Sequence, residues 1–295
     1  MRTLIEAIGF GIASGVVYSL GAVGFTVQFG ISNILNITYG AFMTLAAYLG
    51  YLMLTSLGVW LTLVVVGLLT GIASVAFNRA LLAPLSRRGT GFVGVVIVTV
   101  AAGIILQYCI VAIAGPDTVS YGQQSGSTVH AGYLVFTTSQ LIIIAITVAA
   151  MFTLHLLLTG TQLGRAMRAT SANRTVARSC GIPVNSIIDV TWLISGTLCG
   201  AAGVALAIST VTFDFTLGPT FLIYMIAAAV LGGIGQPYGA MLGGLVVGIV
   251  SQVASAYTSP AYQDVYAFGI LILMLLIRPR GLFAVGTPSA RRLAG

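Results

Sequence analysis

The chain has 295 residues, of which 58% are hydrophobic and only 6% are charged. A soluble domain needs about a quarter charged residues, so this composition excludes a soluble enzyme or binding module and indicates an integral membrane protein. The 12 basic residues outnumber the 5 acidic ones, but they lie in short gaps between apolar segments, which argues against a nucleic-acid partner. All of the basic residues are arginine, because the chain contains no lysine.

Apolar segments of the kind that cross a membrane recur along the whole chain. In chain order they cover residues 4–27, 37–54, 59–77, 92–114, 141–158, 187–208, 221–234, 240–256 and 265–277. The pattern predicts an all-α, polytopic integral membrane protein with about 8–10 transmembrane helices, some of them broken or re-entrant. No stretch is left over for a soluble module, so we expect residues 1–295 to form a single transmembrane domain.

Arginines gather after the third, the fifth and the last of these segments, whereas the polar gap at 116–140 contains none. The three clusters are Arg79, Arg87 and Arg88; Arg165, Arg168, Arg174 and Arg178; and Arg278, Arg280, Arg291 and Arg292. Cytoplasmic loops of membrane proteins carry an excess of basic residues. We therefore expect the clusters on the cytoplasmic side, and both the 116–140 gap and the N-terminus outside.

The second arginine cluster lies in a segment that can form one helix over residues 164–180. Gly181 ahead of Pro183 predicts the end of this helix, and Ser186 with Asp189 predicts the N-cap and third residue of the next. At helical spacing the small residues share one face and the arginines take the remaining arc. The small face consists of Ala166, Ala169, Ala172, Val176 and Ala177, and the arc of Arg168, Arg174 and Arg178. From spacing alone, these arginines either set topology and contact lipid headgroups or belong to a docking surface.

Two segments interrupt the apolar pattern with residues that disfavour a helix. Asn36, Thr38, Tyr39 and Gly40 form the first break, and four glycines with Pro237 form the second, between 231 and 239. Non-helical backbone at membrane depth survives where protein or a water-filled cavity satisfies it, and paired breaks point to a translocation site. The alternative is that Gly40, Gly232 and Gly233 serve close helix packing.

Several chemistries are excluded by what the chain lacks. A phosphate-binding P-loop requires a lysine, so ATP hydrolysis would have to occur on another chain. His130 lies in the 116–140 gap and His155 near a segment end, with no carboxylate patterned beside either, so a packed or interfacial histidine is favoured over a catalytic base. Cys109, Cys180 and Cys199 are far apart and form no C-x-x-C pair, so we expect no metal site, disulfide or cofactor.

Four stretches lie in order between residues 33 and 283, along most of the length of the chain: NILNITYG, LGRAMRATSANRTVARSCGIPVNSI, AAAVLGGIGQPYGAMLGG and AYQDVYAFGILILMLLIRPRGLF. They resemble the branched-chain amino acid ABC transporter permeases and, within that group, the LivH-type family. The resemblance implies that the segment around 164–180 is the cytoplasmic coupling helix, which enters a groove of the ATPase subunit. It implies coupling roles for Gly164, Arg165, Arg168, Ala169, Asn173, Arg174, Ala177, Gly181 and Ile182. It also implies a translocation pathway at Asn36, Tyr39, Gly40, Tyr224, Gly232, Gly233 and Gly235.

The same resemblance implies a permease subunit that moves branched-chain or related amino acids inward by alternating access, as small-molecule substrates. Its partners would be ABC ATPase subunits, a second, LivM-like permease subunit and an extracytoplasmic solute-binding protein, in a bacterial or archaeal cell membrane.

The sequence departs from the family pattern at two positions. Tyr39 stands where the family usually has histidine, and Tyr224 where it usually has lysine. These departures put a pathway role at both positions in doubt and leave urea or short amides as alternative cargo. An ion-coupled secondary transporter is a further alternative, although outside the gaps and termini only Glu6 and Asp189 approach the bilayer.

Overall fold

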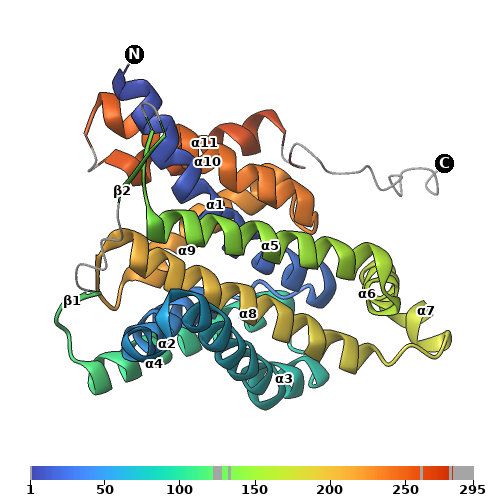
Figure 1. Cartoon of the computed structure of the whole chain (residues 1–295). Coiled ribbons are helices and arrows are strands. Elements are labelled where there is room, and N and C mark those ends of the chain that lie inside the picture. The colour runs from blue at the N-terminus through green and yellow to red at the C-terminus, as the bar shows by residue number, and fades with distance from the viewer. Residues whose placement is uncertain (1, 122–127, 132–133, 260–261, 279–280, 282–295) are drawn as a thin grey trace.

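A computed structural model describes residues 2–121, 128–131, 134–259, 262–278 and 281. Its α-helices are α1 (Arg2–Ser32), α2 (Thr38–Phe77), α3 (Ala83–Arg87), α4 (Phe92–Ala114), α5 (Thr138–Gly160), α6 (Gln162–Ala172), α7 (Arg174–Ser179), α8 (Val184–Thr210), α9 (Leu217–Gly232), α10 (Pro237–Tyr257) and α11 (Gln263–Ile277). A π-helical turn, η1 (Asn78–Leu82), links α2 to α3. The expected all-α polytopic fold is confirmed (Figure 1).

The predicted apolar segments correspond to helices in the structure. Within the described residues, 6 helices are long and apolar enough to cross a membrane, and α9 and α11 are shorter apolar helices. The segments predicted at 37–54 and 59–77 are both contained in α2, which is kinked at Gly58, where φ is +69°. Because a left-handed φ is accessible to glycine without strain, Gly58 allows α2 to change direction between its two apolar halves.

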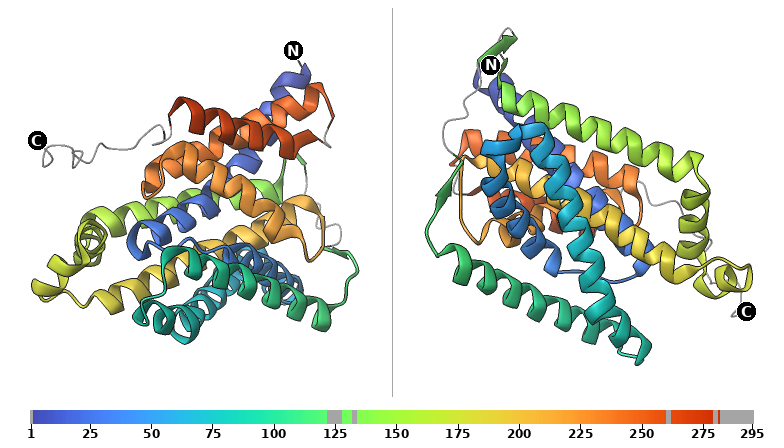
Figure 2. Two further views of the ribbon diagram at one scale, coloured as in Figure 1. Left: turned by 180° about the vertical axis from the view of Figure 1, so that it is seen from behind. Right: turned by 60° about the horizontal axis from the view of Figure 1, so that its bottom comes forward.

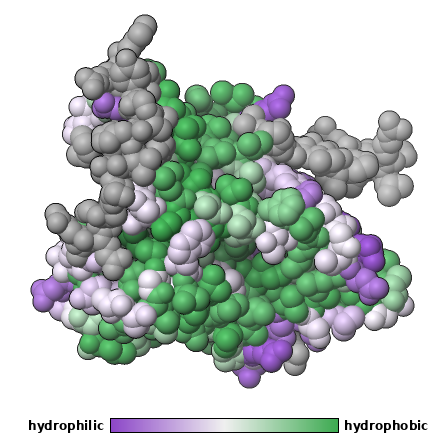
Figure 3. Space-filling view, in the orientation of Figure 1, coloured by the Kyte–Doolittle hydropathy of each residue, from purple (hydrophilic) through white to green (hydrophobic). Residues whose placement is uncertain are grey.

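Small residues hold the central helices together. α1 packs so closely against α10 that a Cβ added at Gly248 would meet the backbone of Gly15. α2 packs equally closely against α8, where a Cβ added at Gly200 would meet Thr70. In a membrane, helix association depends on such close approach because lipid is as apolar as the helices themselves. α4 and α5 run along opposite outer edges of this core (Figure 2, right) and expose apolar side chains. On the face shown in Figure 3, hydrophobic residues cover the middle of the surface.

Short strands lie at one end of the helical bundle. Two antiparallel pairs form there: β1 (Val119–Ser120) with β4 (Thr212–Phe213), and β2 (Thr128–Ala131) with β3 (Leu134–Thr137). α1 contacts β3, so the start of α1 lies at the same end as the strands, and α6 and α7 lie at the opposite end (Figure 1). This arrangement agrees with the sidedness that the arginine distribution predicts. Of the tail arginines, Arg280, Arg291 and Arg292 lie outside the described residues.

Two predicted helix boundaries are wrong. The single helix expected over 164–180 is divided at Asn173, whose φ of −159° and ψ of 108° are extended and whose side chain accepts from the amides of Thr175 and Val176. An asparagine that caps a new helix outweighs the permissive sequence on either side. The stop at Gly181 is confirmed, because its φ is +81° and the amide of Ile182 donates to the carbonyl of Ala177.

The start of α8 is the second wrong boundary. α8 begins at Val184, with Pro183 as N-cap residue and no side-chain cap, so Ser186 and Asp189 are not its N-cap and third residue. Proline fixes φ and suits the start of a helix, which places the N-cap three residues earlier than expected, at Pro183 instead of Ser186. Asp189 is therefore free to bond to another helix.

Candidate translocation and coupling site

The first break is confirmed as an interruption between α1 and α2, but it covers residues 33–37, because Thr38, Tyr39 and Gly40 form the first turn of α2. The chain is non-helical between Ser32 and Thr38, and α4 satisfies part of its backbone through Thr99. The amide of Ile37 donates to Thr99 Oγ1 at 3.3 Å, and the hydroxyl of Thr38 donates to the Thr99 carbonyl at 2.6 Å. Non-helical backbone inside a helical membrane domain requires such hydrogen-bond partners, so the break is an ordered part of the fold.

Unpaired amide groups lie at and near this break. Asn36 is 1% exposed, and among the described residues its Oδ1 has no hydrogen-bond partner. Gln28, on the last turns of α1, accepts from the Ser195 hydroxyl at 3.0 Å through its Oε1, while its Nε2 has no partner within the described part of the chain. Buried polar atoms without partners cost free energy, so unmet hydrogen-bonding capacity of this kind marks a candidate functional position.

Tyr39 joins three helices rather than projecting into an open space. Its side chain is fully buried, and its hydroxyl donates to the Gly21 carbonyl of α1 at 3.0 Å and lies 3.4 Å from the Ser195 carbonyl of α8. The thiol of Cys199 donates to the Tyr39 carbonyl at 3.3 Å. The phenol of Tyr39 is thus a structural contact between α1, α2 and α8.

Removing this hydroxyl should lower stability. We expect Tyr39→Phe to reduce the free energy of unfolding by about 1 kcal/mol, the usual net value of a buried hydrogen bond. Denaturant unfolding of the purified protein in detergent measures the change. Tyr51→Phe, at an exposed tyrosine on the same helix, is the matched control. Equal stability of the two variants would contradict the contact.

The second break is also confirmed and lies against α1. α9 ends at Gly232 and α10 begins at Pro237, with Gly233 and Gly235 at φ of +103° and +89°. A Cβ added at Gly30 would lie 3.1 Å from Cα of Gly235, so the second break touches the last turn of α1, just before the first break. Close packing, the alternative for the glycines, holds for Gly232, whose added Cβ would meet Gly239.

Gly40 and Tyr224 also lie at contacts between helices. A side chain added at Gly40 would be 3.0 Å from the Gly218 carbonyl oxygen, where α2 meets α9. The hydroxyl of Tyr224 donates to Asp264 at the start of α11, and its ring stacks on Tyr18 of α1 with 5.1 Å between centroids. Tyr224 therefore links α1, α9 and α11.

The arginine-bearing segment is fastened to the ends of α1 and α5. Arg174 donates to the Ile31 carbonyl at 2.7 Å, and the Ser171 hydroxyl donates to the Gly30 carbonyl at 2.6 Å. Arg168 donates to the Leu158 carbonyl of α5. The last carbonyls of a helix lack partners within the helix and carry partial negative charge, so these cationic and hydroxyl groups satisfy them. The pKa of the Arg174 guanidinium lies below its usual value, mainly because the group is partly buried and secondly because of the nearby charge of Arg178.

The expected small-residue face is not a single face. Because the segment breaks at Asn173, Ala177 is buried, Ala166 and Ala169 are half-buried, and Ala172 is exposed. Gly164, Met167, Thr170 and Ala177 turn toward the rest of the protein, while Arg165, Asn173, Val176, Arg178 and Gly181 are exposed and Ile182 is half-buried. Val176, a large apolar side chain, is 56% exposed.

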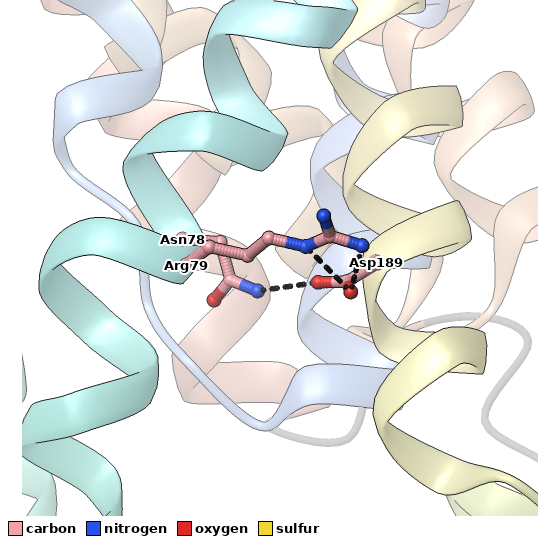
Figure 4. A network of polar contacts seen from close by, with 3 residues as sticks. All are labelled: Asn78, Arg79 and Asp189. Carbon is pink, nitrogen blue, oxygen red and sulfur yellow. Dashed lines mark hydrogen bonds and ion pairs between the residues drawn. The ribbon is translucent and has the colours of Figure 1, made fainter.

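Sequence reasoning missed a polar contact between η1 and α8. Asp189 accepts from Asn78 at 3.3 Å and pairs with Arg79, whose Nη2 lies 2.8 Å from its carboxylate (Figure 4). A signal was present, because Asp189 is an acidic residue in an apolar helix that begins on the same side as an arginine cluster. Since the Arg79 side chain is 68% exposed, such a pair contributes about 0–1 kcal/mol.

The histidine and cysteine positions fit structural roles. His155 Nδ1 lies 2.8 Å from the Tyr238 hydroxyl, beside an apolar cavity of about 380 Å³ between α1, α5 and α10. The side chain of His130 lies outside the described residues. Cys109, Cys180 and Cys199 are free thiols, and within the described ranges no group of three His, Cys, Asp or Glu side chains could hold a metal ion.

Comparison with known proteins adds independent findings. Residues 7–275 match the family model described as the permease component of the branched-chain amino acid transport system. The high-affinity branched-chain amino acid transport system permease protein BraD of Pseudomonas aeruginosa is 30% identical, over 96% of each chain. The permease protein LivH of Escherichia coli is 28% identical over 96% of each chain. The permease protein LivM of Salmonella typhimurium is 25% identical, over 95% of this chain and 71% of that one.

Proposed function

Because the chain belongs to the family of branched-chain amino acid transport system permease components, we propose that it is the membrane subunit of an ATP-driven importer. One observation supports this proposal most: α6 and α7 are bound to the carbonyl ends of α1 and α5 and still present an exposed surface. A segment that is bonded to transmembrane helices and also exposed on its other side receives force from a partner and passes it to those helices.

The partners follow from this division of labour. Without lysine the chain has no P-loop, so separate ABC ATPase subunits would supply the energy. The similarity to LivM supports pairing with a second, LivM-like permease subunit, and the importer class implies an extracytoplasmic solute-binding protein. The complex would lie in a bacterial or archaeal cell membrane, with α6 and α7 in the cytoplasm.

The proposed cargo is a branched-chain or related amino acid, moved inward by alternating access. When the ATPase subunits close, they would displace α6 and α7, and the bonds of Ser171 and Arg174 would carry that displacement to the end of α1. This end adjoins the first break in sequence and the second break in space, through Gly30 and Gly235. One displacement of α6 and α7 would therefore move both breaks together. Switching a central site between the two sides of the membrane requires such a coupled movement.

Val176 provides a direct test of ATPase docking. We expect Val176→Glu to abolish co-purification of the ATPase, because an exposed apolar side chain is a natural anchor for a partner and a buried, unpaired charge is costly. Val211→Glu is the matched control, since Val211 is 50% exposed and lies after α8 at the opposite end of the protein. Retention of the ATPase by Val176→Glu would contradict the docking assignment.

A further inference from the structure

A polar cavity of about 990 Å³ opens at the end of the bundle that carries α3 and α7. Arg79, Arg88, Arg174 and Arg178 line it, and among its described lining residues Asp189 is the one acidic side chain. The cavity therefore holds a clear excess of positive charge. A concentration of arginines around a hollow of this size favours a bound anion.

Two of the four arginines already have partners in the protein, and the other two are available to bind an anion. Arg79 pairs with Asp189, and Arg174 binds the Ile31 carbonyl. Arg88 and Arg178 are exposed, and within the described residues no carboxylate is paired with either. The start of α8 adds to the positive potential, because it lacks a side-chain cap and Asn185 of its first turn lines the cavity.

The cavity lies close to the point where the exposed apolar surface of α4 begins. Its wall residue Leu82 packs with Val95 of α4 and Trp192 of α8 in a small apolar cluster. α4 starts four residues after Arg88, and Phe92 and Val93 are already 53% and 68% exposed there. Exposed apolar side chains next to an arginine mark the boundary between hydrocarbon and headgroups.

An apolar stripe leads away from this boundary along α4. Val93, Ile97, Val100 and Ile104 are all exposed, and their spacing of four, three and four residues places them on one helix face. The basic cavity and the apolar stripe together complement the chemistry of a phospholipid, which has an anionic head and apolar acyl chains.

We infer that the cavity binds the phosphate headgroup of an anionic phospholipid, such as phosphatidylglycerol, and that its acyl chains lie along the stripe of α4. Arg88 and Arg178 donate to the phosphate oxygens, and the uncapped start of α8 faces the same charge. A lipid is favoured over an acidic segment of a protein partner because the cavity adjoins exposed apolar residues of a membrane-spanning helix. The inference does not depend on the direction of transport or on the cargo.

The test compares lipids retained by the full chain, purified with the subunits that accompany it. The protein is incubated in mixed micelles of phosphatidylglycerol and phosphatidylcholine at equal amounts, and bound lipid is quantified by mass spectrometry. We expect the wild type to enrich phosphatidylglycerol, and Arg88→Gln to lower the enrichment about fivefold, which corresponds to about 1 kcal/mol per basic residue. Arg178→Gln should act in the same direction.

Arg278→Gln is the control, because it removes the same charge at the end of α11 and does not line the cavity. Equal enrichment in Arg88→Gln and Arg278→Gln, or no preference in the wild type, would overturn the inference. Complete displacement of phosphatidylglycerol by inorganic phosphate in millimolar excess would identify a free-phosphate site instead. Loss of the ATPase from Arg88→Gln with unchanged lipid enrichment would identify a protein docking site, which also overturns it.

Discussion

Replacing Ser171 and Arg174 together by alanine should lower leucine uptake by about tenfold to a hundredfold while the transporter complex stays assembled. The two side chains bond α6 and α7 to the carbonyls of Gly30 and Ile31. A neutral bond such as that of Ser171 is worth about 0.5–1.5 kcal/mol and one from a charged donor such as Arg174 about 1.5–3 kcal/mol, so their loss weakens the link between the ATPase and α1. Uptake into proteoliposomes and ATP hydrolysis are measured on the same preparation, and hydrolysis is expected to continue.

Thr175→Ala is the matched control for this variant. Thr175 is exposed on α7, and its contact with Asn173 uses the backbone amide, which the substitution retains. Uptake by the control should match the wild type. Normal uptake by the double variant would show that the bonds of Ser171 and Arg174 do not transmit force, and a parallel loss of ATPase binding would show that they only support docking.

Gly232→Val should abolish transport and destabilise the protein by about 1–3 kcal/mol or more, the range for overpacking a tight contact. A Cβ at Gly232 would meet the backbone of Gly239 and Ala240, where no flexible side chain can move aside. α9 and α10 would have to separate at the second break. Thermal unfolding in detergent and uptake in proteoliposomes measure the two effects.

Gly269→Val is the matched control, because Gly269 lies on α11 with no heavy atom within 4 Å of an added Cβ. It should retain both stability and transport. A Gly232→Val protein that unfolds and transports like this control would contradict the close contact between α9 and α10.

The membrane-spanning framework was predictable because hydrocarbon thickness and backbone hydrogen bonding leave few solutions for an apolar chain. The existence of both breaks followed from residues that disfavour a helix, and the stop at Gly181 followed from a glycine just ahead of Pro183, whose left-handed φ the structure confirms. The division at Asn173 was not predicted, because a mid-helix asparagine becomes a cap only when tertiary contacts orient the segments on each side.

The orientation of the arginines was also beyond sequence reasoning. Topology rules place Arg168 and Arg174 on one side of the membrane but do not say which atoms they meet. Their partners are the terminal carbonyls of α5 and α1, and such backbone groups are revealed only by the three-dimensional arrangement. For the same reason, Tyr39 and Tyr224 could be noticed as departures from a family pattern, whereas their contacts with Gly21 and Asp264 could not be predicted.

The sidedness of α6 and α7 is the premise of the coupling account, and Cys180 reports on it directly. Cys180 is exposed just after α7, Cys199 is buried, and Cys109→Ser removes the other exposed thiol. A membrane-impermeant maleimide should leave this variant unlabelled in intact cells and should label it in inverted membrane vesicles stripped of peripheral subunits. Labelling in intact cells, with none in the inverted vesicles, would place α6 and α7 outside the cell and contradict the account.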